Sequence, residues 1–136
     1  MNKLIALSVA LMLTGCALFK GDPDRPGYQE GRTAAFLYVA TEPVQPPDIN
    51  EAIRAGYSVM KNLLQEDAVD VFVWMEIKDL YPDTTPEFRE FVFNFYKMAR
   101  QRIAGELEIY PDVPYPKFVE NFLQGVEDSL EDWTGE

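Results

Sequence analysis

The chain has 136 residues and a formal net charge of −11, from 12 Lys and Arg against 23 Asp and Glu. It contains no histidine, and its only cysteine is Cys16. This excludes Ser-His-Asp and Cys-His catalytic sites, His-ligated metals and a disulfide within the chain. The acidic balance repels nucleic acid and anionic lipid head groups, so we expect no nucleic-acid partner. We also expect no cofactor and no metal site, and one folded domain that packing alone stabilises.

The N-terminus is typical of a secretory signal peptide. Lys3 supplies a positive charge, and residues 4–13 form an almost entirely apolar run that is too short to span a bilayer. The sequence Leu13-Thr14-Gly15-Cys16 at its end resembles the lipobox of bacterial lipoproteins. This resemblance implies removal of residues 1–15, acylation of Cys16 and attachment to a membrane through the acyl chains. The alternative is an ordinary secretory signal with a chance cysteine.

The residue after the cysteine is Ala17. In enteric bacteria an aspartate at this place is the usual inner-membrane retention signal, so the resemblance implies an outer-membrane lipoprotein on the periplasmic side. Residues 16–33 follow with several glycines and prolines and no apolar period, and we expect them to be an acylated cysteine and a flexible tether. The remaining residues, 34–136, are expected to form a helical domain.

The first part of that domain contains one ambiguous segment and one clear helix. Residues 34–40 are apolar, but their length and composition leave helix and strand open. After a proline-rich break, Asp48 is a suitable N-cap with Glu51 at capping-box spacing. The helix predicted from there to about residue 65 has one apolar face, formed by Ile49, Ala52, Ile53, Tyr57, Met60, Leu63 and Leu64.

Residues 66–80 fit two patterns. Val69, Val71, Val73, Met75 and Ile77 alternate as on the face of a strand, and β-branched residues favour a strand. A helical stripe is equally well described by Val69, Phe72, Val73, Ile77 and Leu80. No glycine or proline lies between Tyr57 and Tyr81, and no partner strand is evident, so we favour a helix.

Two further helices are predicted with clear apolar faces. Thr85 and Pro86 form an N-cap and a first-turn proline, and the helix to about residue 107 should be the centre of the core. Its stripe is Phe88, Phe91, Val92, Phe95, Tyr96, Met98, Ala99 and Ile103. In the helix over about 116–133, the stripe is Phe118, Val119, Phe122, Leu123, Val126, Leu130 and Trp133, and the opposite acidic face should be solvated.

Some residues do not match the pattern of their helix. Glu76 and Arg102 fall at apolar positions, and a buried ion pair between them is the simplest way to satisfy both charges. An Arg that reaches solvent and a polar ligand site are the alternatives. Trp74 and Phe93 lie off their stripes. Either the connector with Tyr110 and Tyr115 covers them, or these aromatic residues contribute to a partner-binding surface.

We therefore predict an all-α protein, a small irregular bundle of four to five helices behind a flexible tether. A non-catalytic interaction or accessory role for another envelope protein fits best, with the identity of that partner open. The layout, but no motif, resembles that of pilotins, small outer-membrane lipoproteins that escort secretin subunits. One alternative is a phage- or plasmid-encoded lipoprotein that blocks a surface receptor. Another is a peptidoglycan-acting enzyme that uses carboxylates such as Glu76.

Overall fold

The computed structural model describes residues 25–43, 45–66 and 68–134. Cys16 and the lipobox lie outside the described residues. The described residues contain five helices and no strand, which confirms the all-α prediction. The helices are α2 (Tyr28–Thr41), α3 (Ile49–Leu63), α4 (Asp70–Leu80), α5 (Pro86–Ile109) and α6 (Tyr115–Thr134). The two segments that left helix and strand open, 34–40 and 66–80, therefore both contribute to helices.

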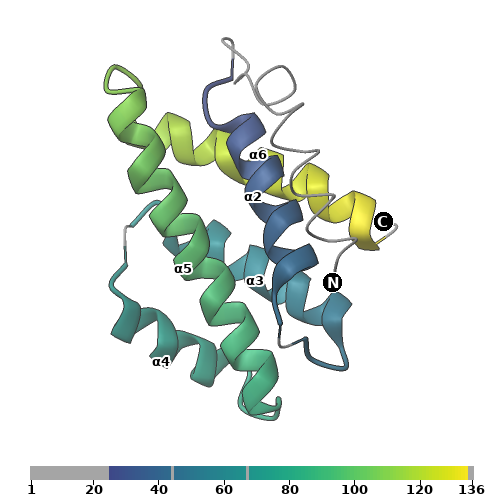
Figure 1. Ribbon diagram of the computed structural model, residues 1–136. Coiled ribbons are helices and arrows are strands. Elements are labelled where there is room, and N and C mark those ends of the chain that lie inside the picture. Colours follow the sequence, from purple (N-terminus) through teal and green to yellow (C-terminus); the bar gives the residue numbers. More distant parts are fainter. Residues whose placement is uncertain (1–24, 44, 67, 135–136) are drawn as a thin grey trace.

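Helix α5 is the centre of the bundle. It packs against each of the other four helices, and Figure 1 shows it running the length of the molecule beside α4 at one end and α6 at the other. The Thr85 hydroxyl accepts a hydrogen bond from the Phe88 amide at 3.2 Å, as an N-cap should. The predicted stripe is buried except for Met98, which is half-buried. The aromatic rings of α5 thus form the core as predicted.

Helices α2 and α6 make the most extensive contact between any two helices of the described chain. A Cβ atom on Gly31 or on Gly125 would come within 2.0 Å of a carbonyl oxygen of the other helix. The two backbones therefore touch, because glycine at these positions leaves no side chain between them. Figure 1 shows α2 crossing α6 at this contact.

This contact corrects the predicted boundary between tether and domain. The tether was expected to reach residue 33, but α2 begins at Tyr28 and residues 25–33 belong to the folded body. Sequence reasoning treated Gly31 as a linker glycine. It is instead the first residue of a buried helical stripe with i, i+3, i+4, i+7, i+8 spacing, formed by Gly31, Ala34, Ala35, Tyr38 and Val39.

The acidic face of α6 was predicted to be solvated, but part of it is not. The Tyr57 hydroxyl of α3 donates a hydrogen bond to Glu127 Oε2 at 2.8 Å, and the Tyr28 hydroxyl of α2 donates one to Asp128. Both carboxylates are half-buried. They sit along the edges of the α6 stripe, where tyrosine hydroxyls of the neighbouring helices reach them, so this part of the acidic face holds the bundle together.

Candidate functional site

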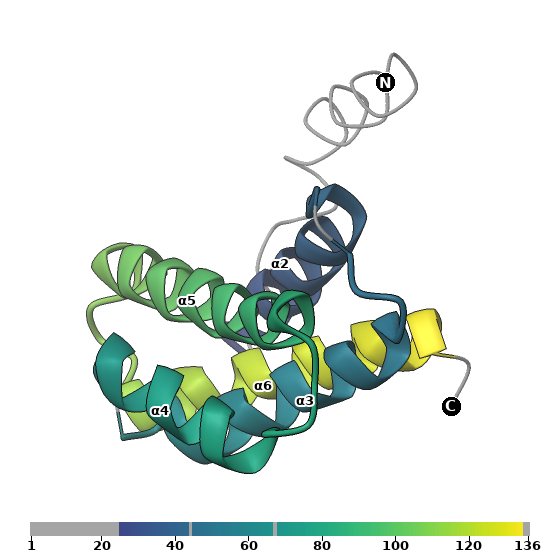
Figure 2. The same cartoon turned by 90° about the horizontal axis from the view of Figure 1, so that it is seen from below.

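Helix α4 lies at the edge of the bundle in both views of the ribbon (Figures 1 and 2). It packs on α5 and, less extensively, on α3. Its only buried residues are Val73 and Ile77. Five large apolar residues of α4 and its N-cap are exposed, and we call them the α4 surface: Val69, Val71, Phe72, Met75 and Leu80. Helix α4 is therefore covered on one side only.

Three residues of the α4 surface, Val71, Phe72 and Met75, form a cluster on the outward side of the helix. Val71 is 72% exposed and Met75 58%, whereas the inward Val73 is fully buried. At 100° per residue Val71, Phe72 and Met75 fall together on the side of the helix opposite Val73 and Ile77. Isolated exposed apolar residues are ordinary on a protein surface, whereas a contiguous group on one helix is a candidate for an interaction site.

The predicted stripe of this helix was partly wrong. Val69, Phe72 and Leu80 were expected to face the core, and all three are exposed. The physical reason is a ring contact with α5: Trp74 turns toward α5 and lies with its ring centroid 5.2 Å from that of Phe93. Val73 and Ile77 face inward beside this contact, so Phe72 turns outward. Val69 and Leu80 are exposed because they lie at the two ends of α4.

The four aromatic residues named as partner-binding candidates do not form one surface. Trp74 and Phe93 are half-buried and border the α4 surface, with the Lys97 ammonium 5.1 Å from the Phe93 ring centroid. The Tyr115 hydroxyl donates a hydrogen bond to the Leu64 carbonyl at 2.6 Å, which ties α6 to the end of α3. Trp74 and Phe93 pack on each other, whereas the connector residues Tyr110 and Tyr115 contact Phe118 and the end of α3.

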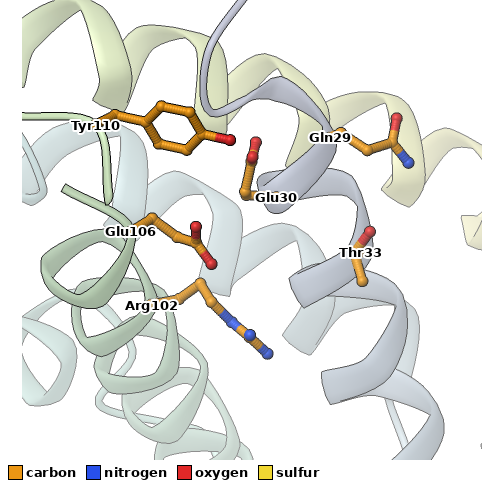
Figure 3. A pocket seen from close by; sticks show the side chains of 6 residues that line it. All are labelled: Gln29, Glu30, Thr33, Arg102, Glu106 and Tyr110. Carbon is orange, nitrogen blue, oxygen red and sulfur yellow. The ribbon is translucent and has the colours of Figure 1, made fainter. Parts of the chain in front are cut away.

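The fourth aromatic residue, Tyr110, lines a cavity of about 250 Å³ between α2 and the C-terminal half of α5. The lining is mostly polar, as Figure 3 shows, and consists of Gln29, Glu30, Thr33, Arg102, Glu106 and Tyr110. Two of its oxygen atoms, Glu30 Oε2 and Thr33 Oγ1, are buried and have no hydrogen-bond partner among the described residues.

The charges around this cavity influence one another. Burial raises the pKa of Glu106 above its ordinary value, and the negative charge of Glu30 raises it further, while Arg102 lowers it. The pKa of Tyr110 is also raised, by burial first and then by Glu30 and Glu106. The Tyr110 hydroxyl points toward Glu30 in Figure 3. Two carboxylates are thus held near each other with only one cation, Arg102, in the lining.

The predicted buried pair of Glu76 and Arg102 is wrong. Arg102 is exposed and Glu76 half-buried, and no ion pair joins them among the described residues. Arg102 follows Phe93, which contacts α4, by nine residues along α5. At 100° per residue this places Arg102 about 180° around the helix, on the side opposite α4. Arg102 therefore lies beside α2 and its side chain lines the cavity (Figure 3).

Sequence reasoning missed the residues that α2 contributes to this cavity. Gln29, Glu30 and Thr33 had been assigned to the tether, although Glu30 and Thr33 have the i, i+3 spacing of one helix face. Arg102 and Glu106 have the corresponding i, i+4 spacing on α5. Only the packing of α2 on α5 brings the two pairs together.

Comparisons with known proteins and structures found no relative of this chain. The chain matches no protein-family model, no curated protein and no solved structure. Within the described residues, His, Cys, Asp and Glu side chains form no group that could hold a metal ion. Of the helices that the structure describes, none is both long enough and apolar enough to cross a membrane. Fold and surface thus define a small all-helical domain with one exposed apolar helix and one charged cavity.

Proposed function

We propose that this protein is a non-catalytic interaction protein of the bacterial envelope. In this proposal acylated Cys16 anchors the chain to the periplasmic side of the outer membrane, and the α4 surface binds another envelope protein. The observation that carries the proposal is the exposure of four large apolar side chains on α4, and of Val69 at its N-cap, although the helix packs against α5 and α3.

The composition of the α4 surface favours binding over catalysis. Its side chains are aliphatic, aromatic or thioether groups, which stabilise a complex when they leave water but supply no acid, base or nucleophile. Met75 and Phe72 lie at its centre, flanked by the ring pair of Trp74 and Phe93. An apolar centre bordered by aromatic rings is the usual composition of an interface whose binding energy is concentrated in a few residues.

A site-specific crosslinking experiment in living cells tests this proposal. A photo-crosslinking amino acid replaces Met75 in the full chain, and the control places it at Ile109, which is also exposed and apolar but lies at the far end of α5. We expect one discrete adduct in the membrane fraction from position 75 and none from position 109. Equal adducts from both positions would contradict the proposal, as would an adduct formed only with a second copy of the chain.

Surface variants then link the adduct to the apolar side chains. With the crosslinker at position 75, we expect Val71→Ser combined with Phe72→Ser to abolish the adduct without lowering the melting temperature, because both side chains are exposed in the free protein. Ile109→Ser is the matched control and should leave the adduct unchanged. A double variant that keeps the adduct would show that the α4 surface does not bind the partner.

A further inference from the structure

The chain contains few sulfur atoms that an oxidant can attack. Mild oxidants attack sulfur in protein side chains, either as a thiolate or as a thioether. The only cysteine is Cys16, and in the proposed lipoprotein its sulfur is joined to the lipid anchor, so no thiol remains. Of the five methionines, Met1 and Met12 lie in the segment that the signal-peptide prediction removes. The folded domain is therefore left with three methionine thioethers, at positions 60, 75 and 98.

The fold exposes one of these three methionines. Met60 is fully buried in the core, and Met98 is half-buried and packs against the core. Met75 is 58% exposed, on the outward side of α4. An oxidant has to reach the sulfur atom, so the exposure of the side chain decides how fast each methionine reacts. Met75 is therefore the methionine that the folded domain presents to an oxidant in solution.

Met75 also lies where a change in polarity has an effect on binding. At 100° per residue it falls between Val71 and Phe72, and all three side chains are exposed. Oxidation to the sulfoxide converts the flexible apolar side chain into a polar one with a strong hydrogen-bond acceptor. When such an acceptor is buried against an apolar partner without a donor, the complex is weakened. The free domain tolerates the same oxygen atom, because water can donate to it there.

We propose that Met75 is a site of reversible oxidation, and that its sulfoxide prevents the α4 surface from binding its partner. This inference rests on the proposed function. The oxidant is an uncharged two-electron oxidant such as hypochlorous acid, because the acidic chain repels anionic oxidants. In the net reaction an S–O bond forms, the O–Cl bond breaks, and chloride and a proton are released, so that sulfur loses two electrons and chlorine gains them. A methionine sulfoxide reductase reverses the change: two thiols supply two electrons, and the oxygen leaves as water.

Limited oxidation of the purified full chain in detergent tests the choice of site. Hypochlorous acid is added in less than the molar amount of the chain and then quenched, and peptide mass mapping locates the added oxygen. We expect the sulfoxide at Met75 to dominate, Met98 to react later and Met60 to stay unmodified, in the order of their exposure. In urea the three should react alike, because unfolding removes the difference in exposure. Oxidation of Met60 or Met98 as fast as Met75 in the folded chain would overturn the proposal.

The effect on binding is measured with the photo-crosslinking amino acid at Val71, so that Met75 remains available for oxidation. The purified chain is oxidised or left untreated, quenched, mixed with solubilised membranes of cells that lack this protein, and irradiated. We expect oxidation to lower the yield of the adduct by about tenfold, because the sulfoxide oxygen is left without a donor in the complex. Reduction by the two methionine sulfoxide reductases, one for each epimer, should restore the adduct.

Leucine variants assign the effect to one sulfur atom. Met75→Leu removes the sulfur and keeps an apolar side chain of similar size, so its adduct should resist the oxidant. Met98→Leu is the matched control, and its adduct should remain as sensitive as that of the wild type. An adduct that survives complete oxidation of Met75, or one that Met75→Leu fails to protect, would overturn this inference and leave the proposed function standing.

Two further outcomes are distinguishable from these. The absence of an adduct from the untreated chain would contradict the proposed function and, with it, the regulatory role of Met75. The melting temperature of the oxidised chain should equal that of the untreated chain, because Met75 is exposed in the free protein. A lower melting temperature would show that oxidation acts through unfolding, and it would overturn the proposal that the sulfoxide acts at the binding surface.

Discussion

Gly31 of α2 lies against the backbone of Phe122 in α6, so closely that a Cβ atom at position 31 would stand 2.0 Å from the Phe122 carbonyl oxygen. The reciprocal contact brings Gly125 of α6 against the Tyr28 carbonyl. These contacts determine how near the first and last described helices approach, and with them the position of α2 above the cavity that it shares with α5. The distance between the two helices is therefore set by the absence of side chains.

We predict that Gly31→Ala destabilises the protein by at least about 2 kcal/mol, because a methyl group at this position forces the two backbones apart. Gly125→Ala should act in the same direction. The measurement is the free energy of unfolding from urea denaturation followed by circular dichroism. Gly105→Ala is the control: a Cβ there meets nothing within 4 Å, so better helix propensity should stabilise the protein by up to about 1 kcal/mol. Equal effects at positions 31 and 105 would contradict the close crossing.

The core and the α4 surface should respond differently to the loss of an aromatic ring. Phe95 is fully buried and its ring stacks on Tyr38 with centroids 4.6 Å apart. We predict that Phe95→Ala costs about 3–5 kcal/mol in the free energy of unfolding, whereas Phe72→Ala changes it by about 0.5 kcal/mol at most, because Phe72 is 45% exposed. A large loss of stability in Phe72→Ala would show that Phe72 packs in the folded body and is not available to a partner.

The stability of the protein should depend on pH through Glu106. Burial and then Glu30 raise the pKa of its carboxyl above the ordinary 4.5, against the lowering effect of Arg102. Folding therefore favours the protonated form. This contribution to stability is fully present below the ordinary pKa and is lost as pH rises through the raised pKa.

Glu106→Gln tests this dependence, because glutamine is neutral at every pH. We expect the variant to melt above the wild type at neutral pH and the difference to vanish as pH falls below 4.5, the ordinary value. Glu108→Gln, on the exposed side of the same helix, should show no such trend. A Glu106→Gln variant that melts below the wild type at neutral pH would contradict the expected sign.

The anchor at Cys16 can be tested independently of the folded domain. If the lipobox is used, the wild-type protein partitions into detergent and its intact mass includes fatty-acyl chains on Cys16 after removal of residues 1–15. Cys16→Ser should leave the chain unprocessed or unlipidated. An intact mass that shows an unlipidated wild-type chain with a different N-terminus would exclude the lipoprotein prediction and the proposed location.

Much of the fold could be read from periodicity. Helices α5 and α6 have stripes of large apolar residues at helical spacing, and the structure buries almost all of them, including Phe91, Phe95, Phe118 and Phe122. Several large rings at helical spacing form one apolar face, and that face leaves water when the helix packs, so the inward position of these rings follows from the periodicity. The start of α5 at Thr85 and Pro86 is equally local, because a cap and a first-turn proline act on neighbouring residues.

The α2–α6 crossing and the cavity required the tertiary structure. Glycine has no side chain to reveal a buried face, so whether Gly31 belongs to a tether or to a helix contact depends on Phe122, far along the chain. Glu30 and Glu106 are likewise remote in sequence, and only the packing of α2 on α5 makes them neighbours.

The exposure of α4 was also decided by tertiary structure. Its apolar residues are compatible with a helix buried all round, and they would be buried if further helices surrounded it. Among the described helices α5 and α3 flank α4, and Val73, Ile77 and the ring of Trp74 face them. The periodicity of the sequence predicts that a segment is a helix with an apolar face. The number and position of its neighbours determine which of those residues remain in contact with water.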